Sequence, residues 1–284
     1  MILFLTIILT LGLFLFWLFR TPPIERYLEK DISNISANDH KQGILTEQDI
    51  ADFPKQFRNY IRFTKAVGKP LVNNFRIAFE GDFALKIGSP FIKVKSVQYI
   101  SAIKPLRLFY LKTRIVGMPL YGRDSYADGT GQMWGRLLNS FPVFNESGEE
   151  FRISELVTYL NDAIIFCPAV FVNLKPQLQW EELDNNKLLV SFEDHGLRVS
   201  AELYFNDQHV LTNFITNDRF CENPVRGKNQ PRYVRAKWST PLSAEWQELD
   251  ERMVPKRGRA LWHLEEPGFC YADFQIRSFS VNNN

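Results

Sequence analysis

The sequence is poor in the residues that build metal and redox centres. It has three cysteines, Cys167, Cys221 and Cys270, whose number is odd, whose spacings are wide and which form no CxxC pair. Its four histidines are far apart, and none has a second His or Cys at the spacing of metal ligands. Metal and redox motifs are therefore unsupported. We predict no metal site and no cofactor, and leave the disulfide state of the cysteines open.

A surplus of charge is also lacking, because 34 basic side chains stand against 32 acidic ones and the formal net charge is +2. Proteins that bind nucleic acid usually carry a basic stripe, so no nucleic-acid partner is predicted. The most basic stretch is RGKNQPRYVRAK, Arg226 to Lys237. It fits a solvated loop and strand edge, and contact with anionic lipid headgroups is the alternative.

The motifs of the common catalytic classes are missing. GxSxG, the P-loop, GxGxxG and HExxH do not occur. Paired carboxylates such as Glu149-Glu150 and Glu181-Glu182 are adjacent in sequence. On a strand such neighbours point to opposite faces, which makes them poor acid/base couples. No catalytic residue is predicted, and we do not expect an enzyme.

One long apolar run is present. Residues 2–19, ILFLTIILTLGLFLFWLF, contain no charged side chain, and only Thr6 and Thr10 are polar. As a helix the run would cover about 27 Å, close to the hydrocarbon thickness of a bilayer. A cleavable signal peptide is the alternative, but no basic residue precedes the run and no small-x-small site follows it. Residues 1–20 are therefore predicted to be a single transmembrane anchor.

Helical patterns follow the anchor at three places. Residues 21–45 are predicted to be a juxtamembrane linker with a short helix at IERYLEKDI. Thr46 and Asp49 suit a helix cap, and Pro54 is expected to open a second helix. The segment SGEEFRISELVTYLNDAIIF has helical periodicity, with Ser147 or Ser154 as the expected cap.

Most of the remaining sequence alternates with period two, as in Leu197 to Phe205. Asp128-Gly129 stands between two such runs and predicts a hairpin turn. The pattern indicates roughly ten to twelve strands in successive hairpins, which form an antiparallel meander. A sheet of that length twists and curls. We predict a mainly β fold with a few helices (α+β), in which residues 46–284 form one curved sheet, or half-barrel, with packed helices.

The concave face of such a sheet is the predicted ligand site. Its candidate lining residues are apolar or aromatic residues of strands: Phe109, Trp134, Trp180, Phe192, Leu203 and Trp238. In a closed sandwich the same residues would be core. Arg123 and Asp124 form either a surface pair or a pair that orients a ligand headgroup.

Several segments resemble a bacterial family known only as a domain of unknown function. They are PPIERYL or the later Phe53 to Tyr60 stretch, GMPLYGRDSYADGTGQMWGRLL, ELVTYLNDAIIFCPAVF, LQWEELDNN and a late run with Trp246, Val254-Pro255, Trp262 and Phe269 to Tyr271. The similarity extends from about Pro54 to Val281, with a departure after Cys221. It implies no activity. More loosely, the strand succession resembles the half-barrel of lipoprotein-sorting factors of the bacterial envelope, which hold acyl chains.

Three functions are compatible with these features. The leading hypothesis is a membrane-anchored, non-catalytic domain that binds a lipid or another apolar molecule. The alternative is a scaffold that binds another protein through a sheet edge or through Arg226 to Lys237. The third is a hydrolase built around Arg123, Asp124 and His195. The side of the membrane stays open, because Arg20, Arg26 and Lys30 after the anchor favour the cytoplasm, whereas the looser resemblance favours the periplasm.

Overall fold

The fold is known from a computed structural model, which describes residues 22–35, 40–225, 227, 230–264 and 268–283, together with residues 4, 6, 10 and 12. The predicted anchor, residues 2–19, lies outside the described residues except at those last four positions. Within the described part of the chain, no helix combines the length and the apolar character that crossing a membrane requires.

Period-two burial builds one 13-stranded sheet in the order β6-β5-β4-β3-β2-β1-β15-β14-β11-β10-β9-β8-β7. Its strands are β1 (Asn74–Phe83), β2 (Ile92–Ser101), β3 (Leu106–Ile115), β4 (Met118–Ala127), β5 (Thr130–Leu137), β6 (Phe141–Ser147), β7 (Leu178–Asp184), β8 (Lys187–Asp194), β9 (Leu197–Phe205), β10 (Leu211–Glu222), β11 (Tyr233–Ser239), β14 (Arg257–Trp262) and β15 (Phe269–Val281). A separate pair consists of β12 (Trp246–Leu249) and β13 (Arg252–Pro255).

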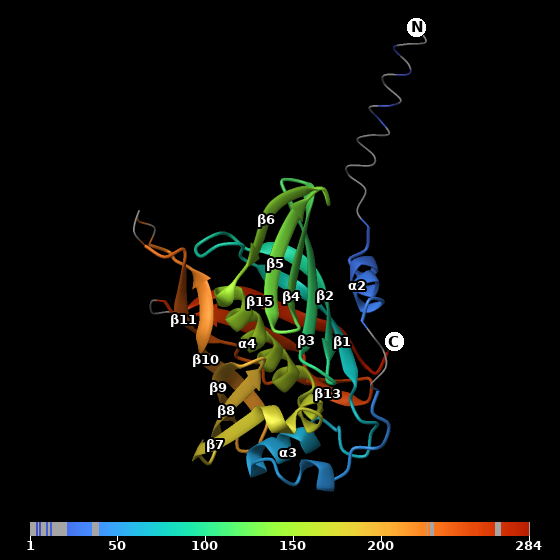
Figure 1. Cartoon of the computed structure of the whole chain (residues 1–284), viewed down its shortest axis with the longest axis vertical. Helices are drawn as coiled ribbons and strands as arrows, with labels where there is room; N and C mark the ends of the chain where they lie inside the picture. The colour runs from blue at the N-terminus through green and yellow to red at the C-terminus, as the bar shows by residue number, and fades with distance from the viewer. Residues whose placement is uncertain are drawn as a thin grey trace.

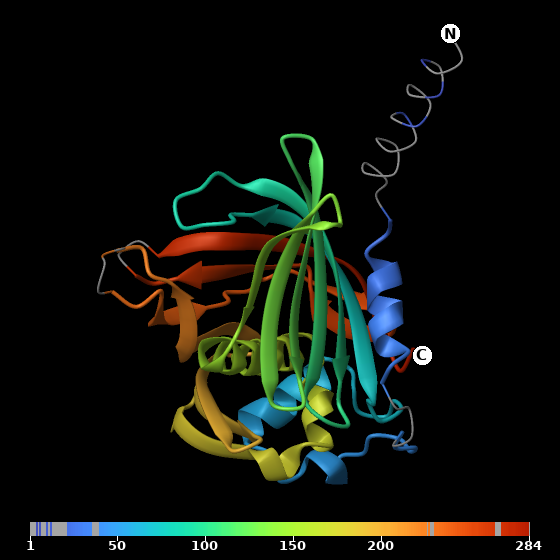
Figure 2. The same cartoon turned by 45° about the horizontal axis from the view of Figure 1, so that its top comes forward.

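All neighbouring strands of the large sheet are antiparallel. Strands β1 to β6 follow one another as hairpins, and so do β7 to β11. The sheet curls strongly, and its two wings face each other across a concave side (Figures 1 and 2). The prediction of a mainly β, curved antiparallel sheet with a few helices is confirmed.

The two series of hairpins meet where the first strand pairs with the last. β15 lies between β1 and β14, and its register with β1 runs from Phe75 opposite Val281 to Phe83 opposite Ala272. Meander reasoning alone would have left β1 at an edge. Instead β1 is central, because the end of the chain returns to its outer side.

Helix α4 (Glu149–Phe166) occupies the concave side of the sheet (Figure 2). It is buried along almost its whole length, and it packs against β4, β5, β9 and β10. The helix begins after Gly148, whose φ of 116° suits glycine, and no side chain caps it. The expected cap at Ser147 or Ser154 was therefore wrong. Ser154 lies inside the helix, and its hydroxyl accepts a hydrogen bond from the Phe220 backbone N–H (3.0 Å).

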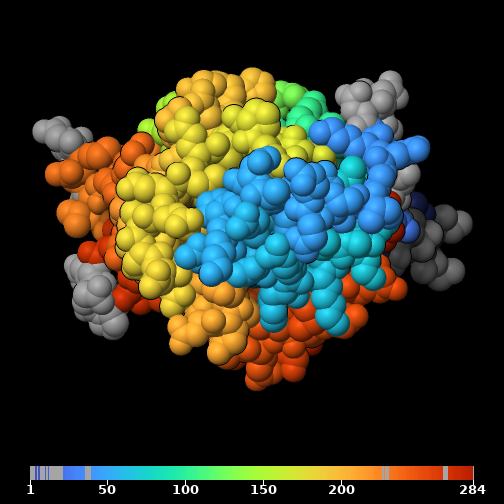
Figure 3. Space-filling view, turned by 90° about the horizontal axis from the view of Figure 1, so that it is seen from below, coloured from blue at the N-terminus to red at the C-terminus, as the bar shows by residue number. Residues whose placement is uncertain are grey.

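One end of the molecule is covered by short helices, and we call it the α3 end. It carries η1 (Gln48–Ile50), α3 (Lys55–Phe63), η2 (Pro168–Val172) and η3 (Lys175–Gln177). Figure 3 views this end, where the segment around α3 lies directly against the segment from η2 to β7. Thr46 and Asp49 are bonded to each other, since the Thr46 backbone N–H donates to the Asp49 carboxylate (2.7 Å) and the Asp49 backbone N–H donates to the Thr46 hydroxyl (3.4 Å). The N-cap of η1 is nevertheless Glu47, whose side chain makes no cap bond. Pro54 directly precedes α3, as predicted.

Helix α2 (Glu25–Ile32) lies in the stretch predicted to be a linker and packs on the convex face of the sheet (Figure 2). Ile24 and Leu28 are buried there in an apolar cluster that includes Tyr110 and Tyr121. The Pro22 carbonyl accepts hydrogen bonds from Lys112 Nζ and from the Tyr121 hydroxyl (both 3.3 Å). These contacts fix the point at which the chain enters the fold.

Candidate functional site

The strand register decides which predicted residues share a face. Tyr110, Arg123 and Trp134 are directly opposite one another on β3, β4 and β5, so their side chains lie on one face. That face is the convex one, because Tyr110 packs against α2. Phe109 and Asp124 form the alternate row, on the concave face.

Arg123 and Trp134 therefore lie on the face of the sheet that α2 covers. Arg123 Nε donates to Asp31 of α2 (2.9 Å), and the same carboxylate oxygen accepts from the Tyr110 hydroxyl (2.7 Å). The Trp134 ring lies 6.1 Å from the Tyr110 ring, edge to face. Arg123 and Asp124 do not act as a pair, because they point to opposite faces of β4.

The other predicted lining residues divide between two places. Phe192 and Leu203 are completely buried, and Phe192 stacks on Tyr159 of α4 at a ring distance of 5.8 Å. Phe109 and Trp238 belong to the same core. Trp180 lies at the α3 end, with its ring 4.6 Å from that of Phe57. The structure therefore brings Phe109, Phe192, Leu203 and Trp238 into the core around α4. Trp180 packs against the same core at the α3 end, whereas Trp134 lies in the separate cluster beneath α2.

A group of charged residues lies within this core, and we call it the inner charged cluster: Arg107, Asp124, Glu155, Asp162 and Arg219. Arg107 extends from β3 towards α4, where it donates to Glu155 (2.9 Å) and Asp162 (2.8 Å). Gln98 of β2 also donates to Asp162 (3.0 Å). All four of these side chains are buried. Burial of charge is costly unless partners compensate it, and here Glu155 and Asp162 each accept a hydrogen bond from Arg107.

The cluster holds three carboxyl groups and two guanidinium groups, so it carries a charge of −1 when every group is ionised. The pKa of Glu155 is raised to about 8, mainly by burial and then by the nearby Asp124, although Arg107 and Arg219 act in the opposite direction. Burial likewise raises the pKa of Asp124. We infer that the Asp124–Glu155 pair retains one proton at neutral pH, which balances the charges. Strongly perturbed carboxyl groups of this kind are common at functional sites.

Arg219 is half-buried, whereas Arg107 and Glu155 are fully buried. Its guanidinium carbon is 4.2 Å from the centre of the Trp238 ring and 5.4 Å from that of Trp262. Its Nη1 donates to the Tyr271 hydroxyl (2.8 Å), which also accepts from Trp238 Nε1 (3.1 Å). Its Nε is buried without a hydrogen-bond partner among the described residues. Arg219 is thus held in place by aromatic rings, and its donors are incompletely used.

A row of aromatic rings continues from Arg219 along the concave side, with successive ring centres 5.8 to 6.4 Å apart. In order, the rings are those of Trp238, Trp262, Tyr271, Phe83, Phe274 and Phe79. They come from β11, β14, β15 and β1. Tyr271, Phe83 and Phe274 remain partly exposed. The row is therefore an apolar surface that begins at a guanidinium group.

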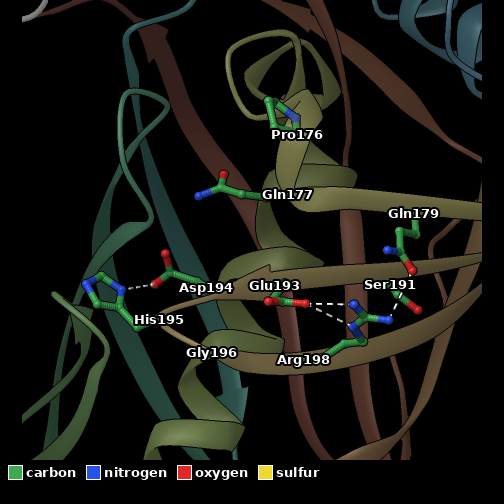
Figure 4. Close-up of a pocket in the computed structure, with 9 residues that line it drawn as sticks. All are labelled: Pro176, Gln177, Gln179, Ser191, Glu193, Asp194, His195, Gly196 and Arg198. Carbon is green, nitrogen blue, oxygen red and sulfur yellow. Dashed lines mark hydrogen bonds and ion pairs between the residues drawn. The ribbon is translucent and has the colours of Figure 1, made fainter.

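A second candidate is a surface pocket of about 230 Å³ at the turn between β8 and β9 (Figure 4). Its polar groups are already paired with each other. Arg198 donates to Glu193 (2.7 Å) and to Gln179 (3.0 Å), and the Ser191 hydroxyl bonds to that of Ser200 (2.8 Å). No base lies next to Ser191 among the contacts of the described residues, so the pocket does not form a nucleophilic centre.

Asp194 and His195 lie at the opposite side of that pocket in Figure 4. Their contacts connect parts of the fold. Buried Asp194 accepts from the Tyr126 hydroxyl (2.6 Å), and the same carboxylate oxygen contacts His195 Nδ1 (2.9 Å). Arg152 of α4 donates to the backbone carbonyls of Gly129 and His195 (2.9 and 2.8 Å). These contacts join the β4–β5 turn to the β8–β9 turn. His195 is therefore paired with Asp194 rather than with Asp124.

The Asp128-Gly129 segment forms the hairpin turn between β4 and β5, as predicted. Ala127 pairs with Thr130, Asp128 has a φ of 47° and Gly129 a φ of 72°. The Asp128 carboxylate is exposed and pairs with Lys104 (2.9 Å). Nothing in these contacts gives Asp128 a role beyond the turn and its surface ion pair.

The residues that the sequence did not single out are Arg107, Glu155, Asp162, Arg219 and Tyr271. Two signals were available for some of them. Arg107 is charged within the otherwise apolar LRLFYL, and Glu155 and Asp162 are seven residues apart on a largely apolar helix, which places them on one face. Arg219 gave no such signal, because it stands in a polar stretch of β10.

The residues of the described ranges include no group of three His, Cys, Asp or Glu side chains that could hold a metal ion, and all three cysteines are free thiols.

Comparison with known proteins adds a family but no activity. The model of a family of unknown function (DUF6544) matches residues 43–274. No curated protein matches the chain.

Proposed function

We propose, for a chain that belongs to the DUF6544 family and inherits no assigned activity from it, that the concave face of the sheet binds an amphiphile with an anionic headgroup. The headgroup, a carboxylate or a phosphate, pairs with Arg219. The apolar part lies along the aromatic row through Tyr271, Phe83 and Phe274. The apolar segment 2–19 keeps this site close to a membrane, which is a source of such molecules.

The position of Arg219 is the observation that supports this proposal. A guanidinium group with free donors is the usual partner of carboxylate and phosphate oxygens. Stacking between Trp238 and Trp262 orients it before any ligand arrives, which lowers the entropy that binding costs. The partly exposed rings that follow supply an apolar surface for a chain.

The proton of the Asp124–Glu155 pair supports an anionic rather than a cationic headgroup. With one carboxyl group neutral, the cluster presents no net negative charge to an incoming anion. Binding of the anion next to the pair favours retention of the proton. Catalysis is not part of the proposal, since neither carboxyl group of this pair faces a nucleophile among its described contacts.

Photo-crosslinking in membranes tests the proposal at single-peptide resolution. Membranes that contain the full chain are incubated with a diazirine fatty acid or a diazirine phosphatidic acid, irradiated, and mapped by mass spectrometry. We expect labels in β1 and β15, at peptides that contain Phe83, Tyr271 and Phe274. The two probes distinguish a carboxylate from a phosphate headgroup.

Arg219→Met keeps an apolar stem next to the tryptophans but removes the charge. Loss of a charge-assisted hydrogen bond should lower labelling of β1 and β15 about tenfold or more. Arg198→Met, which removes an exposed arginine of the pocket at the β8–β9 turn, is the matched control and should label like the wild type. Labelling of β1 and β15 that is absent in the wild type, or unchanged in Arg219→Met, would refute the proposal.

A further inference from the structure

Three hairpin loops lie at the end of the sheet away from α3. Consecutive antiparallel strands alternate in direction, so the β1–β2, β3–β4 and β5–β6 loops all fall at one end. We call it the hairpin end; its loops are residues 84–91, 116–117 and 138–140. In Figure 1 the β3–β4 and β5–β6 loops lie at the top of the sheet and the β1–β2 loop extends to the left below them, with α3 at the bottom of the molecule.

Large apolar side chains are exposed on all three hairpins. Val116 is 92% exposed, Phe141 54%, Val143 58% and Phe91 50%. Leu85 and Ile87 add to the first loop. Single exposed apolar residues are common on protein surfaces, but here they recur on three loops at one end of the sheet. The hairpin end is therefore a candidate contact surface.

The charges around these apolar residues have one sign. Residues 83–95, 112–119 and 136–144 contain no Asp or Glu. Their cations are Lys86, Lys93, Lys95, Lys112, Arg114 and Arg136. Carboxylates of β1 pair with two of these cations: Asp82 with Lys93, and Glu80 with Lys95.

A groove of about 770 Å³ adjoins the first two hairpins on the side of the sheet formed by β14 and β15. Lys93, Lys95, Lys112 and Arg114 line it, and so do Arg257 and Arg277. Three carboxylates also line it: Glu80, Asp82 and Asp273. Cations thus outnumber anions in the groove as well as on the loops.

The chain joins the fold at this same end. Pro22 is bonded to Lys112 and Tyr121, which oppose each other in the register of β3 and β4. Both residues are within five positions of Val116, at the tip of that hairpin. The apolar sequence of residues 2–19 therefore precedes a point of attachment beside the exposed loops.

We propose that the hairpin end docks on a lipid bilayer that contains anionic lipids. The exposed apolar side chains enter the boundary between headgroups and acyl chains, and the surrounding cations contact lipid phosphates. A membrane fits better than a protein partner, because the apolar side chains stand on separate loops among cations rather than in one continuous patch. This docking is independent of the ligand site on the concave face.

Hydrogen exchange of the full chain in nanodiscs tests the docking. We measure the exchange rate of the backbone amides in the loop at residues 84–91, in nanodiscs of phosphatidylcholine with or without phosphatidylglycerol. We expect exchange at this loop to be about fivefold slower or more in the anionic nanodiscs, since each cation near an anionic surface adds binding free energy. In the triple variant Lys86→Gln, Arg114→Gln, Arg136→Gln, the amides of residues 84–91 should exchange at the same rate in both kinds of nanodisc.

A second variant changes only the other two hairpins. Val116→Asp with Phe141→Asp should abolish the slow exchange at residues 84–91, because the loops enter the bilayer together. Leu183→Asp is the matched control: Leu183 is also exposed, but it lies in β7, and its variant should behave like the wild type. Exchange that is the same in all lipids and variants would overturn the proposal. So would slow exchange that appears only at high protein concentration, which would indicate a second copy as the partner.

Discussion

At the scale of single residues, the most unusual group is the buried carboxyl of Glu155. It contacts Arg107 at 2.9 Å and shares its surroundings with Asp124 and Asp162. A pKa raised to about 8 means that the folded protein binds a proton more tightly than the unfolded chain, in which a glutamate titrates near its ordinary value of 4.5. The stability of the protein is therefore linked to pH through this residue.

The sign of this linkage gives a prediction. Below pH 4.5 Glu155 is protonated in both states, and its contribution to stability is fully present. Between pH 4.5 and about 8 only the folded state keeps the proton, so the contribution falls as the pH rises. Glu155→Gln cannot ionise and should lose less stability than the wild type between pH 5 and pH 8, by on the order of 3 kcal/mol.

Urea unfolding at several pH values, followed by tryptophan fluorescence, measures this difference. Glu149→Gln is the control, because Glu149 is exposed on the first turn of the same helix. If the wild type and Glu155→Gln lose the same free energy of unfolding between pH 5 and pH 8, the glutamate does not hold its proton in the folded state.

At the scale of elements, the contact between α4 and β5 depends on Gly131. A Cβ built at this position would lie 2.3 Å from the carbonyl oxygen of Phe151, in the first turn of α4. Glycine thus allows the helix backbone to approach the strand more closely than any side chain would permit. The approach explains why α4 can occupy the narrow concave side of the sheet.

Gly131→Ala should therefore destabilise the protein by about 1–3 kcal/mol, because backbone atoms on both sides must move apart. Gly122→Ala in the adjacent strand β4 is the matched control, since the nearest atoms to its added Cβ are 3.9 Å away. Thermal unfolding of both variants compares the two. Equal melting temperatures would mean that the helix shifts without cost.

At the scale of the whole molecule, the Asp194 contact joins two distant parts of the sheet. Tyr126 belongs to β4 and Asp194 to the end of β8, and the strand order separates them by many strands. Their hydrogen bond, supported by Arg152 of α4, holds the curl of the sheet closed on this side.

Asp194→Ala leaves the buried Tyr126 hydroxyl without its acceptor and should cost about 3 kcal/mol of unfolding free energy. Tyr126→Phe combined with Asp194→Ala should cost little more than Asp194→Ala alone, which a double-mutant cycle in urea reports. His195→Asn is the control for the exposed partner of Asp194, with an expected loss below about 1 kcal/mol. Additive losses at Tyr126 and Asp194 would contradict the link.

The sequence predicts the strands and most helices of this fold because their signals are local. Period-two alternation, the Asp128-Gly129 turn and Pro54 before α3 each act within a few residues. The position of α4 inside the curl and the pairing of β1 with β15 are not local, and no short pattern encodes them. The inner charged cluster was missed for the same reason, since Arg107, Glu155 and Arg219 come together only after the sheet has curled.

The pairing of β1 with β15 also orders events during synthesis. On a ribosome, β1 emerges almost 190 residues before the strand that completes the centre of the sheet. Until Phe269 to Val281 is released, β1 has a nascent neighbour on one side only, and its other edge offers unpaired backbone groups to any other chain. A premature stop codon shortly before β15 would remove less than a tenth of the polypeptide, yet it would divide the sheet at its middle.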